Sequence, residues 1–216
     1  MRTLLITGLL GSGKSTVLLS LAAYLGRKAG PRAVVIVENE IGDMPQEASC
    51  PMPAKGGTSP SPSRPASVEM TNDCICCTLT GELVGLLEEI KTSYNPSWLI
   101  VEASSLAHQS IKDIIHQTLN IFEPLSILVV DAGRWRETYE EVPMLVGTQA
   151  TRADLILVTK ADTVPAAELG HVLGELRRLN PSCPIRPIDP RTDDLSGIWA
   201  DLVAEAEGFE PFQAQG

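Results

Sequence analysis

The stretch RTLLITGLLGSGKST, residues 2–16, decides the fold of this chain. Its apolar segment at residues 4–6 is short enough to be a buried β-strand. Residues 8–15 follow directly, match the pattern G-x-x-x-x-G-K-[ST], and precede a run with helical spacing. A strand, such a loop and a helix, in that order, are typical of a phosphate-binding loop (P-loop). The stretch therefore predicts a nucleoside triphosphate site, and the alternative is a glycine-rich turn without a ligand.

The residue types in the P-loop suit a polyphosphate with its magnesium ion. The glycines have no Cβ, so the loop can adopt positive φ angles and bring its N–H groups close to phosphate oxygens. We expect Lys14 to reach the β- and γ-phosphates and act in catalysis, and the Ser15 hydroxyl to ligate magnesium. The expected phosphate-binding loop residues are Gly11, Ser12, Gly13, Lys14 and Ser15.

Length and charge limit the classes of function. A chain of 216 residues suits one α/β domain with a full core, and we expect a single domain over residues 1–216. A net charge of −10, from 17 basic and 27 acidic residues, argues against a nucleic-acid or anionic-membrane surface. The sequence has no apolar run of the length of a membrane span or a signal peptide, so we expect a cytoplasmic protein with protein partners and cations.

Apolar runs alternate with segments of helical period along the chain, which predicts a doubly wound, mainly parallel α/β sheet. A Pro-, Ser- and Gly-rich insertion at residues 44–67 interrupts the pattern, and we expect it to be mobile. Beyond the first strand, strands are expected at 33–37, 68–71, 98–102, 124–130, before Lys160, and at 184–188. Helices are expected at 17–28, 78–94, 106–119, 166–179 and 195–207.

Acidic residues follow two of the expected strands. Glu40 and Asp43 come after the strand at 33–37, at the sheet edge where ligands bind in open α/β folds. We expect them to contact the cation, the γ-phosphate or the attacking water. Glu102 ends the strand at 98–102, which is the place of a Walker B acid that holds magnesium. The alternative is that these acids only make a loop and a strand end polar.

Three of the five cysteines, Cys74, Cys76 and Cys77, lie within four residues. This spacing is poor for a disulfide framework but suits thiolate ligands of zinc, cobalt, nickel or copper(I). The cysteines precede the helix expected at 78–94, whose N-terminal dipole favours the thiolate. Buried cysteines that only pack are the alternative.

The residues after another expected strand indicate guanine recognition. Thr159, Lys160 and Asp162 fit the pattern [NT]-K-x-D, in which both carboxylate oxygens of the aspartate accept hydrogen bonds from guanine N1–H and its amino group. Adenine has no such pair of donors, so the carboxylate discriminates against it. The Lys160 stem would lie along the base, and the loop from Asp189 to Asp194 would cover its other side.

Together these motifs resemble the CobW/HypB/UreG family of metal-linked P-loop GTPases. They stand in family order and cover nearly the whole chain, and the CICCTL stretch at residues 74–79 is similar to the CobW branch. The resemblance implies a SIMIBI-type GTPase fold, and it adds Thr16 to the phosphate and magnesium site. It also implies that Glu40 and the three cysteines bind a transition metal, first zinc and otherwise cobalt or nickel.

By this resemblance, slow GTP hydrolysis to GDP would switch metal affinity, and the metal would pass to a client metalloenzyme or corrin ring. A nucleotide- or metal-dependent homodimer is also expected. The family usually has glycine at the positions of Asp73 and Ser105, and its second, C-terminal domain has no counterpart among the expected elements. The alternative is a GTP-dependent regulatory partner of a corrinoid protein or another metalloenzyme, without metal transfer.

Overall fold

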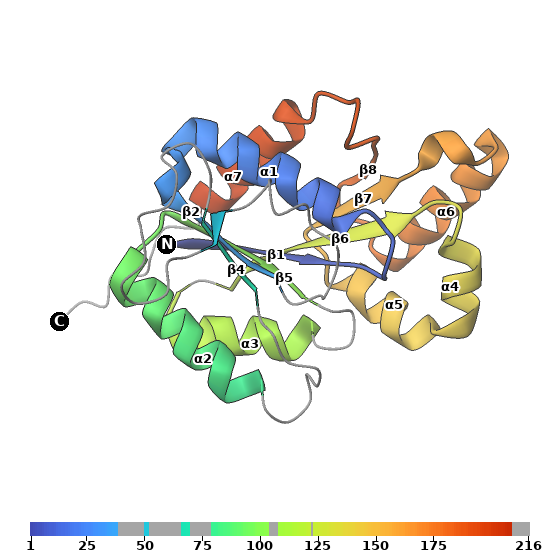
Figure 1. The fold of residues 1–216 in the computed structure, drawn as a ribbon. Coiled ribbons are helices and arrows are strands. Elements are labelled where there is room, and N and C mark those ends of the chain that lie inside the picture. The colour runs from blue at the N-terminus through green and yellow to red at the C-terminus, as the bar shows by residue number, and fades with distance from the viewer. Residues whose placement is uncertain (39–49, 52–65, 70–78, 104–107, 122, 209–216) are drawn as a thin grey trace.

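The computed structural model describes residues 1–38, 50–51, 66–69, 79–103, 108–121 and 123–208. The strands among these residues form one sheet, and helices cover both of its faces (Figure 1). The predicted doubly wound α/β fold is therefore confirmed.

The sheet has eight strands in the order β3-β4-β2-β5-β1-β6-β7-β8, and each of their pairings is parallel. The strands are β1 (Arg2–Thr7), β2 (Val34–Glu38), β3 (Cys50–Pro51), β4 (Ala66–Glu69), β5 (Trp98–Glu102), β6 (Leu125–Asp131), β7 (Leu155–Thr159) and β8 (Ile185–Pro187). The central strand β1 pairs with β5 on one side and with β6 on the other. The chain winds in opposite directions from this strand, so the carboxyl end of β1 is the switch point where open α/β sheets bind ligands.

The helices cover the two faces of the sheet unequally. Helices α1 and α7 pack on one face, and α2 to α6 pack on the other (Figure 1). The helices are α1 (Lys14–Ala29), α2 (Leu79–Glu89), α3 (His108–Leu119), α4 (Trp135–Glu141), α5 (Pro143–Thr151), α6 (Ala166–Leu179) and α7 (Ser196–Gly208). A π-helical turn, Ile90–Tyr94, continues α2, and short 3-10 turns lie at Pro31–Ala33 and Ala161–Thr163.

The central strands β1, β5, β6 and β7 are buried on both faces, which explains their continuous apolar sequences. Alternate residues point to opposite faces, so Leu4 and Ile6 of β1 pack with α1 and α7 while Leu5 packs with α2 and α3. Trp199 of α7 is 1% exposed, and its indole N–H donates a hydrogen bond to Ser20 Oγ of α1 (3.1 Å). These contacts fix the first and last helices against each other on one face.

Most predicted elements agree with the structure to within a few residues. The helix predicted at 166–179 is α6, and the helix predicted at 78–94 corresponds to α2 with its π-helical turn. Helices α4 and α5 were not predicted. Within the insertion predicted at 44–67, Cys50–Pro51 forms β3, and β4 begins at Ala66 rather than at the predicted residue 68.

Among the described residues, no helix is long and apolar enough to cross a membrane.

Candidate nucleotide-binding site

The carboxyl ends of the central strands place the predicted nucleotide residues along one edge of the sheet. The P-loop follows β1, Glu102 ends β5, and Lys160 follows β7. Ile6 of β1 lies opposite Glu102 of β5 in the parallel register. Because all these strands are parallel, their ends meet at the same edge, and residues far apart in sequence converge there.

The P-loop backbone has the conformation that its glycines make possible. Gly8, Gly11 and Gly13 have φ angles of +147°, +77° and +94°. A Cβ on Gly8 would lie only 2.3 Å from the carbonyl oxygen of Val129 in β6, so no side chain fits there. The loop thus passes directly over the end of β6, and helix α1 begins at the next residue after Gly13. This is the strand, loop and helix arrangement that the pattern predicted.

Two buried charges lie beneath the loop. Lys14 and Glu102 are each 3% exposed, and Lys14 Nζ lies 3.9 Å from Glu102 Oε1. Lys14 Nζ also donates a hydrogen bond to the carbonyl oxygen of Leu9 (3.2 Å). Ser15 is half-buried in the first turn of α1, where the N–H groups and the helix dipole favour an anion. A hydroxyl and a carboxylate are hard oxygen ligands, which suit Mg²⁺.

The end of β7 holds the P-loop from the other side. The Thr159 hydroxyl donates to the carbonyl oxygen of Ser12 (2.6 Å) and also lies 3.1 Å from that of Val130. Lys160 has a φ of +55° and extends Nζ to the carbonyl oxygen of Gly11 (2.7 Å) and to Asp131 Oδ2 (2.7 Å). The Lys160 side chain therefore runs from the predicted base site toward the phosphate loop.

The two predicted base-contacting acids differ in their surroundings. Asp162 lies in the exposed 3-10 turn Ala161–Thr163, two residues after Lys160. Asp189, after β8, accepts from Arg191 Nε at Oδ1 (3.0 Å) and from Nη2 at Oδ2 (3.3 Å), and the Arg191 N–H donates to Oδ1 (3.0 Å). These side-chain and backbone hydrogen bonds lower the pKa of Asp189 to about 2. The same side-chain hydrogen bond and the charge of Asp189 raise the pKa of Arg191, and the charge of Asp162 adds to this shift. Asp189 thus anchors the loop after β8 through its hydrogen bonds to Arg191.

The structure adds two residues that the sequence did not single out as functional, Asp131 and Arg134. Asp131 ends β6 and bonds Lys160, as described above, and its Oδ1 accepts from the Gly133 N–H (2.9 Å). Arg134 Nη1 donates to the carbonyl oxygen of Leu10 in the P-loop (3.2 Å). An apolar strand that ends on an acid was a visible signal for Asp131, but no local pattern marks Arg134.

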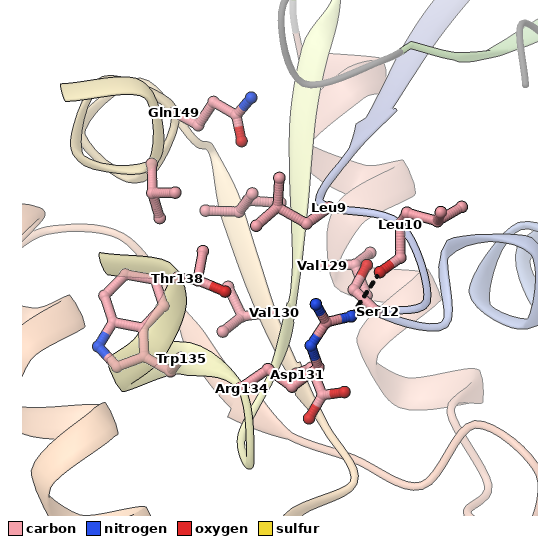
Figure 2. Close-up of a pocket in the computed structure, with 12 residues that line it drawn as sticks. Leu9, Leu10, Ser12, Val129, Val130, Asp131, Arg134, Trp135, Thr138 and Gln149 are labelled. Atoms are coloured by element: carbon pink, nitrogen blue, oxygen red, sulfur yellow. Dashed lines mark hydrogen bonds between the residues drawn. The ribbon is translucent and has the colours of Figure 1, made fainter. Parts of the chain in front are cut away.

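A pocket lies beside the P-loop, on the side of α4 and α5 (Figure 2). Its space, open solvent at its mouth included, is about 370 Å³, and its walls include Leu9, Ser12, Val130, Trp135 and Gln149. Leu10 lies at this pocket and is 72% exposed. Residues of the P-loop, α4 and α5 line this pocket, so α4 and α5 lie next to the predicted nucleotide site.

The predicted metal ligands Cys74, Cys76, Cys77 and Glu40 lie outside the described residues, as do Asp43, Asp73 and Ser105. The described part of the chain contains no group of three or more His, Cys, Asp or Glu side chains that could hold a metal ion. The transition-metal site thus remains a prediction from the sequence.

Comparison with known proteins agrees with this arrangement. Residues 2–187 match the family described as CobW/HypB/UreG, nucleotide-binding domain. The chain belongs to this family. The match includes the P-loop, the strand that ends at Glu102, and the residues after β7, so the CobW/HypB/UreG assignment covers every described site residue except those of the loop after β8.

Relatives of this CobW/HypB/UreG chain include proteins that are named zinc chaperones. It is 26% identical over 197 residues to the zinc chaperone CobW of a Sinorhizobium species, covering 79% of this chain and 54% of that protein. It is 28% identical over 219 residues to the zinc chaperone YjiA of Escherichia coli, covering 95% of this chain and 61% of YjiA. The chain thus spans little more than half the length of these relatives.

A solved structure supports the fold. A Zn(II)-bound triple mutant of the YjiA GTPase superposes with a TM-score of 0.61 at 22% identity, covering 97% of this chain and 63% of that one.

Proposed function

We propose that this chain binds magnesium-GTP, hydrolyses it slowly to GDP, and uses the cycle to bind and release a transition metal for a client metalloenzyme or corrinoid protein. The observation that carries the nucleotide half is the convergence of Lys14, Glu102 and Lys160 on one P-loop. Membership in a family with GTPase members supports it. Zinc is the first candidate metal, because relatives are named zinc chaperones; cobalt and nickel are the next.

The nucleotide residues divide into two groups by what they can contact. Lys14 would turn from the Leu9 carbonyl to the β- and γ-phosphates, and Ser15 and Glu102 would hold a magnesium ion that would balance the charge of the phosphates. Gly11, Ser12, Gly13 and Thr16 would complete the phosphate cradle. In the second group, Asp162 would accept two hydrogen bonds from guanine, Lys160 would lie along the base, and the loop anchored by Asp189 would cover the base.

The metal half of the proposal comes from sequence and family. Glu40, Cys74, Cys76 and Cys77 offer a carboxylate and soft thiolates, which suit zinc. Glu40 and Asp43 follow β2, and Cys74 to Cys77 precede α2, so both segments connect to the same sheet that carries the P-loop. Metal and γ-phosphate could then affect each other, and such coupling is reciprocal. One domain over residues 1–216 and a cytoplasmic location belong to the same proposal.

The test is a zinc titration of the reduced protein in the presence of GDP or of a non-hydrolysable GTP analogue. We expect zinc to bind more tightly with the analogue, and Cys76→Ser to remove this difference. Cys183→Ser is the matched control, because Cys183 is a buried free cysteine beside β8 that takes no part in the proposed site.

Three results can follow. Zinc affinity that changes with nucleotide and is lost in Cys76→Ser supports the metal cycle. Zinc binding that ignores nucleotide, or that Cys76→Ser leaves intact, contradicts it and favours a GTP-dependent partner without metal transfer. No binding of guanine nucleotide contradicts the first half of the proposal as well.

A further inference from the structure

Three consecutive carbonyl groups of the P-loop are each bound by a different side chain. The carbonyl oxygens of Leu10, Gly11 and Ser12 accept hydrogen bonds at 3.2, 2.7 and 2.6 Å. The donors are Arg134, Lys160 and Thr159, in that order. All three donors come from the ends of β6 and β7, on the side of the loop away from Glu102. The P-loop is thus held through its carbonyl groups along one side.

Holding a carbonyl also orients the N–H group of the next residue. A trans peptide unit is planar, and its N–H points in the direction opposite to its C=O. The described chain has no cis peptide bond. Arg134 therefore directs the Gly11 N–H away from β6, and Thr159 does the same for the Gly13 N–H. The Ser12 N–H donates to the Leu9 carbonyl (3.1 Å), and this hydrogen bond closes a tight turn over residues 9–12.

The three donors differ in how firmly they are placed. Thr159 is 1% exposed and is packed against Gly13. Lys160 is fixed at its tip by the ion pair with Asp131 (2.7 Å). Arg134 is exposed, so a substitution at this surface position would remove its hydrogen bond to the loop without changing a buried side chain.

The backbone under Arg134 is nevertheless fixed. The Arg134 N–H donates to the Asp131 carbonyl (3.3 Å), and the Arg134 carbonyl accepts from Thr138 in the first turn of α4 (3.0 Å). The guanidinium lies close to Gly11, since a Cβ built on Gly11 would be 3.7 Å from Arg134 Nη1. Figure 2 shows the Arg134 side chain extending from the end of β6 to the Leu10 carbonyl.

We propose that Arg134 is a positioning residue for phosphate binding: it holds the Leu10 carbonyl so that the Gly11 N–H faces the bound phosphates. This inference rests on the proposed nucleotide function. It assigns to Arg134 a role in affinity for the phosphate part of the nucleotide, with no role in choosing the base. An oriented N–H need not be reorganised when the anion arrives, which is the reason that preorganisation increases affinity.

The test compares Arg134→Ala, Arg134→Lys and the control Arg136→Ala, because Arg136 is an exposed arginine two residues further along in α4. Dissociation constants are measured for fluorescent GDP and for a non-hydrolysable fluorescent GTP analogue. We expect Arg134→Ala to weaken both by about fivefold, the effect of one charge-assisted hydrogen bond at an exposed position. Arg134→Lys should regain part of the loss, and Arg136→Ala should match the wild type. The preference for GDP over ADP should not change.

The Ser12 N–H donates to the Leu9 carbonyl and closes the turn that contains Leu10, so its hydrogen exchange in nucleotide-free protein is the second readout of how firmly Arg134 holds that turn. We expect faster exchange in Arg134→Ala than in Arg136→Ala, with the melting temperature of the whole domain unchanged. Equal affinities and equal exchange in the two variants would overturn the role of Arg134. If wild-type protein binds no guanine nucleotide, the proposed function fails, and the exchange comparison alone still supports or overturns the contact of Arg134 with the loop.

Discussion

The P-loop is held differently on its two sides. Toward β5, the contact is between two buried charges, Lys14 and Glu102, which lie 3.9 Å apart. Toward β6 and β7, the contacts are direct hydrogen bonds from Thr159 and Lys160 to the loop backbone at 2.6 and 2.7 Å. One side thus carries a buried pair of opposite charges, while on the other side Thr159 and Lys160 hold the carbonyl groups of Ser12 and Gly11.

The two sides of the P-loop should therefore have different roles, one in hydrolysis and the other in loop shape and base selection. The charges on the β5 side are those that GTP and magnesium would engage, so changes there should affect hydrolysis more than binding. The side chains at the end of β7 already have partners within the protein, so changes there should affect loop shape and base selection. The predictions below test this separation, starting with the largest effect.

Glu102→Gln should abolish most magnesium-dependent hydrolysis. We expect kcat for GTP to fall about a hundredfold, because a neutral amide holds magnesium less firmly than a carboxylate, and the magnesium ion would balance the negative charge of the transition state. Affinity for GDP without magnesium should change by less than about threefold, since the contact removed is to the metal. Phosphate-release assays and equilibrium titrations measure the two effects.

Glu207→Gln is the control for Glu102→Gln, because Glu207 pairs with Lys28 on the surface, away from the P-loop. A Glu102→Gln protein that hydrolyses GTP at the wild-type rate would remove Glu102 from the magnesium site.

Asp162→Ala should remove the preference for guanine. We expect affinity for GDP to fall by roughly a hundredfold and affinity for ADP to stay nearly constant, because two hydrogen bonds to guanine are lost and none to adenine. Asp201→Asn, an exposed acid on α7, serves as the control. Equal losses for GDP and ADP in Asp162→Ala would place Asp162 in the structure of the loop and outside base recognition.

Gly8→Ala should destabilise the fold, because the added methyl would meet the Val129 carbonyl at 2.3 Å and the φ of +147° strains any L-residue. We expect a loss of about 2–4 kcal/mol in the free energy of unfolding. Gly174→Ala is a contrasting control in α6, where a Cβ has no neighbour within 4 Å, and it should stabilise by about 0.5–1 kcal/mol. Denaturant titration measures both, and equal effects of the two substitutions would contradict the close passage of the loop over β6.

Thr159→Val should have the smallest effect. It keeps the shape of the side chain but removes the hydroxyl that bonds the Ser12 carbonyl, so we expect a loss of about 1–2 kcal/mol in stability. Thr159→Ser retains the hydroxyl and should lose less than half as much. Comparable losses in the two variants would mean that packing of the methyl group, and not the hydrogen bond, holds the loop.

The sequence predicted the elements whose signals are local. An apolar run followed by an acid identified β5 and Glu102, and the P-loop pattern identified the turn from β1 into α1. Helix α4 was missed because only Trp135 and Thr138 of its seven residues are buried, which is too few for a recognisable apolar stripe. Helix α5 begins at a proline and contains Gly147, which weakens its helical pattern.

Contacts between distant segments explain what else the sequence could not predict. Arg134 and Leu10 are 124 residues apart, and only the parallel pairing of β1 with β6 brings them together. The pattern [NT]-K-x-D admits threonine at position 159 without giving it a role of its own. Its hydroxyl bonds the Ser12 carbonyl, 147 residues away, so it has a specific structural role that the local pattern did not reveal.

The most direct test of the account is the nucleotide preference of the wild-type protein. Calorimetric titration with GDP and with ADP, each with magnesium, measures whether the P-loop after β1 and the residues after β7 form a guanine-nucleotide site. The account predicts binding of GDP at least about a hundredfold tighter than ADP, since only guanine offers both donors to Asp162. Equal affinities for GDP and ADP, or no binding of either, would contradict it.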